Sequence, residues 1–117
     1  MVVLTDRIQK RLTIQTQDIT IDTIAIRSLD WERDRFDIEF GLQNGTTYNS
    51  FIIRGDKLAL VDTSHEKFRQ LYLDTLKGLI DPSQIDYLII SHTEPDHSGL
   101  VREIGRASCR ERVLMPV

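Results

Sequence analysis

The 117-residue sequence has little of what several classes of protein require. Its one cysteine, Cys109, cannot build a disulfide framework. No apolar run approaches the length of a membrane span, and the N-terminus lacks the long apolar region of a secretory signal. The net charge is −3, and no basic stripe exists that could neutralise phosphates. We therefore expect a cytoplasmic protein with no membrane span and no nucleic-acid partner.

The rest of the composition is ordinary for a globular protein, with 40% hydrophobic and 28% charged residues. The length leaves room for one small domain or for part of a larger one. Residues 1–16 read as a polar, mobile N-terminal arm. From residue 17 onward neither an internal repeat nor an obvious linker divides the chain.

Alternating apolar residues predict a run of strands. We expect strands at residues 18–27, 36–40, 48–53, 58–61 and 85–91. The first contains a phase slip near Asp22-Thr23, which is consistent with a bulge. A tight turn at Gly55-Asp56 joins the third to the fourth. Trp31 and Phe36, in and beside a charged connection, are expected to pack in the core rather than to cover a pocket.

Helical spacing takes over after residue 62. Thr63 and Glu66 have the spacing of a capping box. An apolar face follows, made of Phe68, Leu71, Tyr72, Thr75, Leu76 and Leu79. Asp81-Pro82 should end this helix near Ile80. A further helix is expected to begin near Gly99. The order is strands, helix, strand and helix.

The residues richest in chemistry are Ser91 to Leu100. Two imidazoles and two carboxylates occupy the six positions from His92 to His97, directly after the apolar run 87–90. Such side chains at the end of a buried strand are costly unless something binds them, and a pair of metal ions is the natural candidate. His92 and Glu94, two apart, can point the same way in an extended loop. Asp96 and His97 can serve a second metal.

The donor types favour iron or manganese over zinc, because two of the four side chains are carboxylates. The alternative is a solvated polar loop, because each of these residues taken alone is more often solvated than bound to a metal. Their spacing directly after a buried strand favours metal binding. Asp62 is open to two interpretations: an acceptor that orients a ligand histidine, or a plain helix-entry residue beside Thr63. His65 reads as a solvated first-turn residue.

Residues 103–117 break the patterns before them. Glu103 to Val113 is abruptly arginine-rich and has no apolar period. It resembles the in-frame translation of a common sequencing-adapter oligonucleotide, so we predict a non-native tail in which Cys109 has no function. The rival interpretation is a basic, solvated helix end.

The motif His92-x-Glu94-x-Asp96-His97 resembles the signature of the metallo-β-lactamase superfamily. Glutamate at its second position, where histidine is usual, is similar to the flavodiiron proteins. The stretches 28–31, 35–37, 45–50, 62–68 and 91–100 also look like cyanobacterial diflavin flavodiiron proteins. The resemblance covers residues 15–102. It implies an α/β fold, an αββα sandwich, of which residues 17–102 carry only the N-terminal part.

The resemblance also implies a non-haem diiron centre. His92 and Glu94 would bind one iron and Asp96 the other. His97 would bind that second iron in some members and turn away in others. The remaining ligands, FMN and the NAD(P)H-binding domain would lie outside this chain. Whole proteins of this kind pass electrons from NAD(P)H through FMN to the irons and reduce O2 to water.

The resemblance further implies a homo- or heterodimer. The expected location is the cytoplasm, with association with thylakoid membranes as an alternative. The alternative function is a zinc-dependent hydrolase of the same superfamily, in which zinc-bound hydroxide is the nucleophile. Glu94 argues against it. The 117-residue chain alone is expected to be inactive, because a metal site needs its full ligand set.

Overall fold

The computed structural model describes residues 12–31, 35–37, 40–41, 46–107 and 113–114. The strands are β1 (Leu12–Thr20), β2 (Thr23–Asp30), β3 (Arg35–Asp37), β4 (Phe40–Gly41), β5 (Thr46–Arg54), β6 (Leu58–Val61), β7 (Tyr87–Ile89) and β8 (Val113–Leu114). The helices are η1 (Glu66–Phe68), α2 (Arg69–Leu79), η2 (Pro82–Gln84), α3 (Pro95–Ser98) and α4 (Val101–Ala107).

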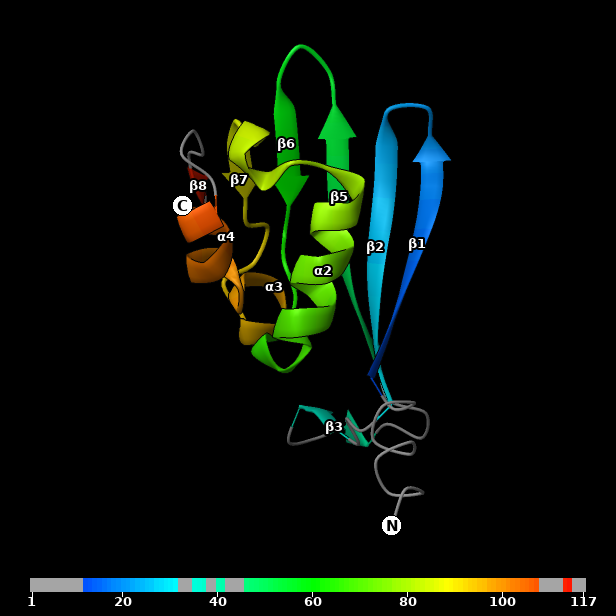
Figure 1. Ribbon diagram of the computed structural model, residues 1–117. Coiled ribbons are helices and arrows are strands. Elements are labelled where there is room, and N and C mark those ends of the chain that lie inside the picture. Colours follow the sequence, from blue (N-terminus) through cyan, green and yellow to red (C-terminus); the bar gives the residue numbers. More distant parts are fainter. Residues whose placement is uncertain (1–11, 32–34, 38–39, 42–45, 108–112, 115–117) are drawn as a thin grey trace.

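A mixed sheet forms the body of the molecule, with the strand order β1-β2-β5-β6-β7-β8 (Figure 1). The first four strands of this order pair antiparallel, whereas β6, β7 and β8 run parallel. The chain between β6 and β7 crosses over through η1 and α2, as a parallel pair requires. The strands β3 and β4 form a separate two-stranded ribbon.

The core lies between the sheet and the helices, which cover one face of it (Figure 1). Phe68, Tyr72 and Leu76 are fully buried and recur at the spacing of one helical face. They meet inward-facing strand residues such as Ile26 and Ile52, which are also fully buried. Burial of this face stabilises α2 more than its intrinsic helix propensity does.

The opposite face of the sheet also carries apolar side chains. Phe51 pairs with Val61 across β5 and β6, and both are half-buried, while Ile53 is 41% exposed. One sheet with helices on one side, in the part of the chain that the structure describes, is one half of an αββα sandwich. The predicted α/β class is therefore confirmed.

The strands β5, β6 and β7 and the helix α2 lie where the sequence predicts them. The strand predicted over residues 18–27 is wrong, because the chain reverses at Ile21–Asp22 and forms the hairpin of β1 and β2. The phase slip marks this turn, and the register irregularity lies earlier, between Asp18 and Thr20. The mobile arm expected over residues 1–16 is also wrong for residues 12–16, which belong to β1; residues 1–11 lie outside the described part.

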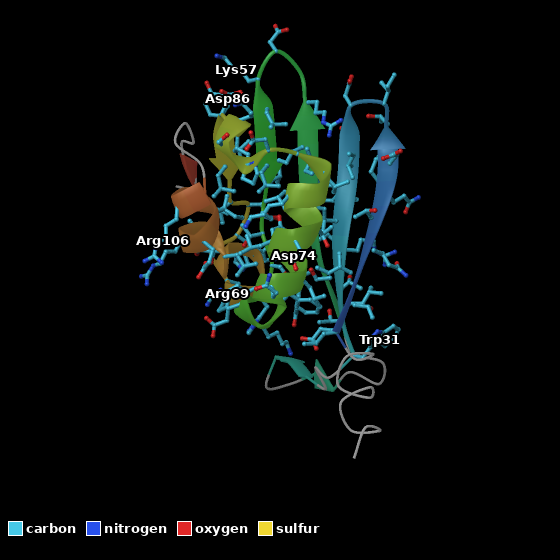
Figure 2. The ribbon with its side chains drawn as sticks, in the orientation of Figure 1. Trp31, Lys57, Arg69, Asp74, Asp86 and Arg106 are labelled. Carbon is cyan, nitrogen blue, oxygen red and sulfur yellow. The ribbon has the colours of Figure 1, made fainter. Side chains whose placement is uncertain are left out.

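Three smaller predictions fail as well. The capping box is not formed, because His65 caps η1 by accepting from the Lys67 amide, while the Thr63 hydroxyl bonds elsewhere. Leu71 is 42% exposed, since only every third or fourth residue of α2 faces the sheet. Trp31 is 46% exposed at the end of β2, outside the core (Figure 2). The side chain of Phe36 lies outside the described residues.

The helix α4 continues from Val101 through residues 103–107, and Ile104 is fully buried against the core. Ile104 lies four residues after the buried Leu100, so this part of the predicted non-native tail keeps a helical apolar spacing. That residues 103–117 form a non-native tail stays a prediction. Among the described residues, no helix combines the length and apolar character needed to cross a membrane.

Candidate metal centre

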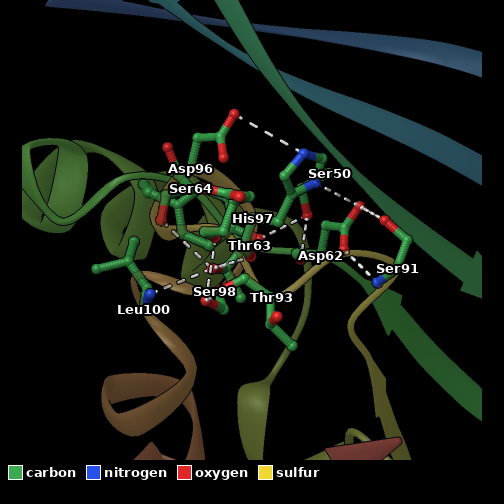
Figure 3. Close-up of polar contacts among 12 residues, drawn as sticks. Ser50, Asp62, Thr63, Ser64, Ser91, Thr93, Asp96, His97, Ser98 and Leu100 are labelled. Carbon is green, nitrogen blue, oxygen red and sulfur yellow. Dashed lines mark hydrogen bonds and ion pairs between the residues drawn. The ribbon is translucent and has the colours of Figure 1, made fainter. Parts of the chain in front are cut away.

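The conspicuous polar residues gather at the carboxyl ends of the parallel strands β6 and β7. Residues 62–65 follow β6, and residues 90–94 follow β7 and lead into α3. Neighbouring parallel strands end at the same edge of a sheet, which brings these two loops together (Figure 3). Ligand sites of open α/β sheets commonly lie at this edge.

Asp62 is at the centre of the cluster and has an unusual backbone conformation. Its φ is +62°, in the left-handed region that side chains other than glycine seldom adopt. Both main-chain groups are satisfied: its amide donates to the Ile89 carbonyl at 2.7 Å, and its carbonyl accepts from Ser50 Oγ at 2.8 Å. The surrounding hydrogen bonds thus hold a conformation that the chain alone would not favour.

The Asp62 carboxylate is buried and contacts both the loop after β7 and the helix α3. Ser91 donates its amide to Oδ1 at 2.7 Å and its hydroxyl to Oδ2 at 2.6 Å. His97 Nδ1 lies 3.1 Å from the same Oδ2. A carboxylate on Nδ1 favours the tautomer with its proton there, and leaves Nε2 with a free lone pair. Of the two interpretations of Asp62, the geometry favours the one in which it orients a histidine.

The main chain at His97 is held as firmly as its ring. Its carbonyl accepts from the Thr63 amide and from the Thr63 hydroxyl, each at 2.7 Å. The Leu100 amide donates to the same hydroxyl at 3.2 Å. These bonds fix the short helix α3 against the loop after β6.

Gly99 lets α3 approach that loop. A Cβ on Gly99 would lie 2.5 Å from the Pro95 carbonyl oxygen and 2.6 Å from the Ser64 carbonyl oxygen. Both atoms belong to the main chain and cannot easily move. Any side chain at this position would therefore push α3 away from Asp62.

The other half of the motif is exposed. His92 Nε2 lies 3.5 Å from Glu94 Oε1, and the two side chains are 61% and 60% exposed. The predicted neighbour relation of His92 and Glu94 is thus present in the structure. The rings of His92 and His97 also approach edge to face, with centroids 5.6 Å apart.

Asp96 completes the set of four. Its Oδ2 lies 3.7 Å from His97 Nε2, the nitrogen that Asp62 leaves free. The pairs His92–Glu94 and His97–Asp96 each place one imidazole nitrogen beside one carboxylate oxygen, which are donor types that metal ions bind. Among the described residues, however, no three histidine, cysteine or acidic side chains converge closely enough to hold an ion. A metal here would need the pairs to close or further ligands to join them.

Sequence reasoning missed the residues that support the cluster. Ser91 and Ser50 carry no ligand-type side chain, and the sequence pattern assigned neither of them a role, whereas Gly99 was expected only to permit a tight entry into the following helix. The one available signal was the position of Ser91 between a buried strand and the motif. His65 is half-buried and stacks on Tyr48, with ring centroids 6.0 Å apart, so it is less solvated than expected.

A profile of the metallo-beta-lactamase superfamily matches residues 44–108, which include the whole cluster. Diflavin flavoprotein A 3 of Nostoc sp. is 79% identical over 104 residues, covering 89% of this chain but 18% of that protein. This chain thus spans about a fifth of the length of that curated relative.

Two solved structures share the fold. The flavodiiron core of Flv1 from Synechocystis sp. is 33% identical with a TM-score of 0.78, and the match covers 87% of this chain and 25% of that one. Rubredoxin oxygen:oxidoreductase from Desulfovibrio gigas is 31% identical with a TM-score of 0.74, covering 85% and 25%. Together with its own motif and fold, these matches show that the chain belongs to the metallo-beta-lactamase superfamily and resembles, within it, part of the cyanobacterial diflavin flavoproteins.

Proposed function

We propose that this chain is the N-terminal, ligand-bearing part of a longer flavodiiron oxidoreductase that reduces O2 to water at a non-haem diiron centre. The observation that carries the proposal is the Asp62–His97 pair. A buried carboxylate holds one imidazole nitrogen while the other nitrogen faces a second carboxylate. Metal-binding histidines are commonly oriented in this way. The similarity to flavodiiron relatives supports iron as the metal.

The four motif residues divide between two irons in this proposal. His92 and Glu94 bind one, Asp96 binds the other, and His97 is available to the second through Nε2. The missing ligands come from parts of the longer protein outside this chain. A bound diiron centre would supply electrons to O2 in pairs, and the four-electron reduction to water would need a second pair, which FMN outside this chain would deliver.

The residues of this chain orient the site rather than transfer electrons. Asp62 keeps the proton of His97 on Nδ1, so that Nε2 remains a ligand. Thr63 holds the His97 main chain, and Ser91 holds the Asp62 carboxylate. Electrons would reach the site from NAD(P)H through FMN, both bound outside this chain, with a second subunit in a dimer bringing its FMN close.

The domain limits follow from the same proposal. Residues 17–102 make up the partial metallo-β-lactamase-like domain, extended at its start by the β1 residues from Leu12, and residues 103–117 are a non-native tail. The chain as written holds iron weakly and is inactive, since it supplies only part of the ligand set. The apolar side chains on the sheet face opposite the helices, among them the exposed Ile53, favour aggregation of the isolated chain.

The decisive experiment is metal analysis of the longer protein, purified without added metal, combined with oxygen uptake in the presence of NADH or NADPH. We expect iron and NAD(P)H-dependent oxygen consumption. The matched control is the Glu94→His variant, which restores the histidine usual in the superfamily and should shift the bound metal toward zinc.

A protein that carries zinc, consumes no oxygen and hydrolyses esters in proportion to added zinc would overturn the proposal in favour of the zinc-dependent hydrolase. Resequencing of the source DNA across codons 98–117 tests the tail. A reading frame that continues past Arg102 into further histidine- and aspartate-bearing strands is the expected result.

A further inference from the structure

A buried hydrogen-bond chain connects the helix α2 to the loop that holds Asp62. Ser50 Oγ lies 2.8 Å from the Asp62 carbonyl oxygen and 2.7 Å from Tyr72 Oη. Ser50 and Tyr72 are both fully buried. Neither residue belongs to the motif, and neither has a part in the function proposed above.

The direction of this chain follows from its chemistry. A carbonyl oxygen can only accept, so the single Ser50 hydroxyl hydrogen must go to Asp62. The Tyr72 hydroxyl must then donate to Ser50 Oγ. Burial raises the pKa of the Tyr72 hydroxyl well above its usual range, so that this donor keeps its proton.

The last acceptor of this hydrogen-bond chain is the carbonyl oxygen of Asp62, a residue with a strained backbone conformation. Asp62 occupies the left-handed region at φ +62°, and its carbonyl direction depends on that conformation. If the carbonyl turns, the carboxylate that accepts from Ser91 and His97 turns with it. The orientation of Nε2 of His97 is therefore coupled to the core of the domain through one peptide group.

We propose that Ser50 and Tyr72 are positioning residues for the metal centre, acting through the backbone of Asp62 on the ring of His97. This inference rests on the proposed function, since it concerns the same site. It predicts that removing a single buried hydroxyl from α2, far along the chain from the motif, changes metal binding.

The test is the Tyr72→Phe variant of the longer protein, titrated with Co(II), whose visible absorption reports its ligands. The matched control is Tyr48→Phe. Tyr48 is also buried, and its hydroxyl donates to Asp30 at 2.5 Å instead of to the Asp62 network. Both variants lose one buried hydroxyl, so that thermal unfolding should be affected in both.

We expect Tyr72→Phe and Ser50→Ala each to weaken Co(II) binding about tenfold and to alter its absorption bands, as the loss of an outer-shell partner does. Tyr48→Phe should keep the wild-type affinity and bands. The double variant Ser50→Ala/Tyr72→Phe should bind no more weakly than Ser50→Ala, because both substitutions break one chain.

Equal weakening by Tyr48→Phe and Tyr72→Phe would show a merely structural effect and overturn the inference, as would wild-type binding in both Tyr72→Phe and Ser50→Ala. If Tyr72→Phe fails to fold by circular dichroism, Ser50→Ala compared with Tyr48→Phe decides on the same criterion. Absence of Co(II) and iron binding in the wild type is a different result, because it removes the proposed function and the inference with it.

Discussion

The two halves of the proposed metal-binding motif differ in how firmly the fold orders their side chains. His97 is held at its ring by the buried Asp62 and at its main chain by Thr63. His92 and Glu94 are about 60% exposed, and the described residues offer their side chains little beyond each other and the edge of the His97 ring. The inner half, which contains His97, is thus ordered by the fold itself. In the proposed site the outer half, His92 and Glu94, would be ordered by a bound metal.

This difference determines whether the entropic cost of ordering each side chain is met during folding or during metal binding. Ordering exposed side chains costs conformational entropy that a metal must offset when it binds. Buried, hydrogen-bonded side chains have already lost that freedom during folding. Substitutions in the inner half should therefore affect stability and metal binding together, while those in the outer half should affect metal binding alone.

The largest effect is expected at Asp62. Asp62→Ala removes the acceptor of Ser91 and His97 and places an alanine Cβ in a left-handed conformation, so we expect a loss of about 3 kcal/mol in the free energy of unfolding. Metal affinity should fall about 10- to 100-fold. Chemical denaturation and metal titration of the whole protein measure the two quantities.

Two control variants separate the causes. Asp62→Gly also lacks the carboxylate but tolerates the positive φ, and should be about 1 kcal/mol more stable than Asp62→Ala. Asp86→Ala removes another carboxylate, one that accepts from the Leu58 amide at 2.8 Å near the Lys57 end of the sheet (Figure 2). It should leave metal binding unchanged. Equal metal affinities for Asp62→Ala and wild type would contradict the orienting role of Asp62.

A smaller effect is expected at Gly99, which tests the close packing of α3. Gly99→Ala brings a Cβ against two carbonyl oxygens and should destabilise the protein by about 1–3 kcal/mol. The matched control is Gly78→Ala, in α2, where a Cβ would meet nothing within 4 Å. That substitution should stabilise the protein by about 0.5–1 kcal/mol. Thermal unfolding decides, and equal shifts for both variants would rule out a close approach at Gly99.

The smallest effect on stability is expected at the outer pair. Glu94→Gln keeps the shape of a side chain that is 60% exposed, so the free energy of unfolding without metal should change by less than about 0.5 kcal/mol. The same variant should lose iron from the site of His92 and Glu94. Urea denaturation of the metal-free protein and iron analysis provide the comparison. A loss of stability comparable to that of Asp62→Ala would mean that the outer half is also built by the fold.

The sequence pattern was sufficient for the elements that the core buries on one face. The period of Phe68, Tyr72 and Leu76 located α2, and the apolar run before Ser91 located β7. It failed for β1, an edge strand whose exposed positions are mostly polar and therefore resemble a mobile arm. The hairpin turn at Ile21–Asp22 was missed because an apolar residue occupies it without glycine or proline.

For the site, the sequence supplied the four candidate ligands but not their support. The left-handed conformation of Asp62 depends on hydrogen bonds with Ser50 and Ile89, which are far away in the sequence. Local spacing cannot reveal such bonds, since they exist only once β5, β6 and β7 are paired. The failed capping box has the same origin, because tertiary contacts recruited the Thr63 hydroxyl to His97.

Amide hydrogen exchange of the whole, metal-free protein would test the contrast between the two halves most directly. The amides of Thr63 and Ser91 donate to His97 and Asp62. We predict that these two amides are protected without metal, that those of His92 and Thr93 exchange rapidly, and that added Fe(II) slows only the second pair. Rapid exchange of all four amides without metal, slowed together by Fe(II), would contradict the claim that the fold builds the inner half in advance.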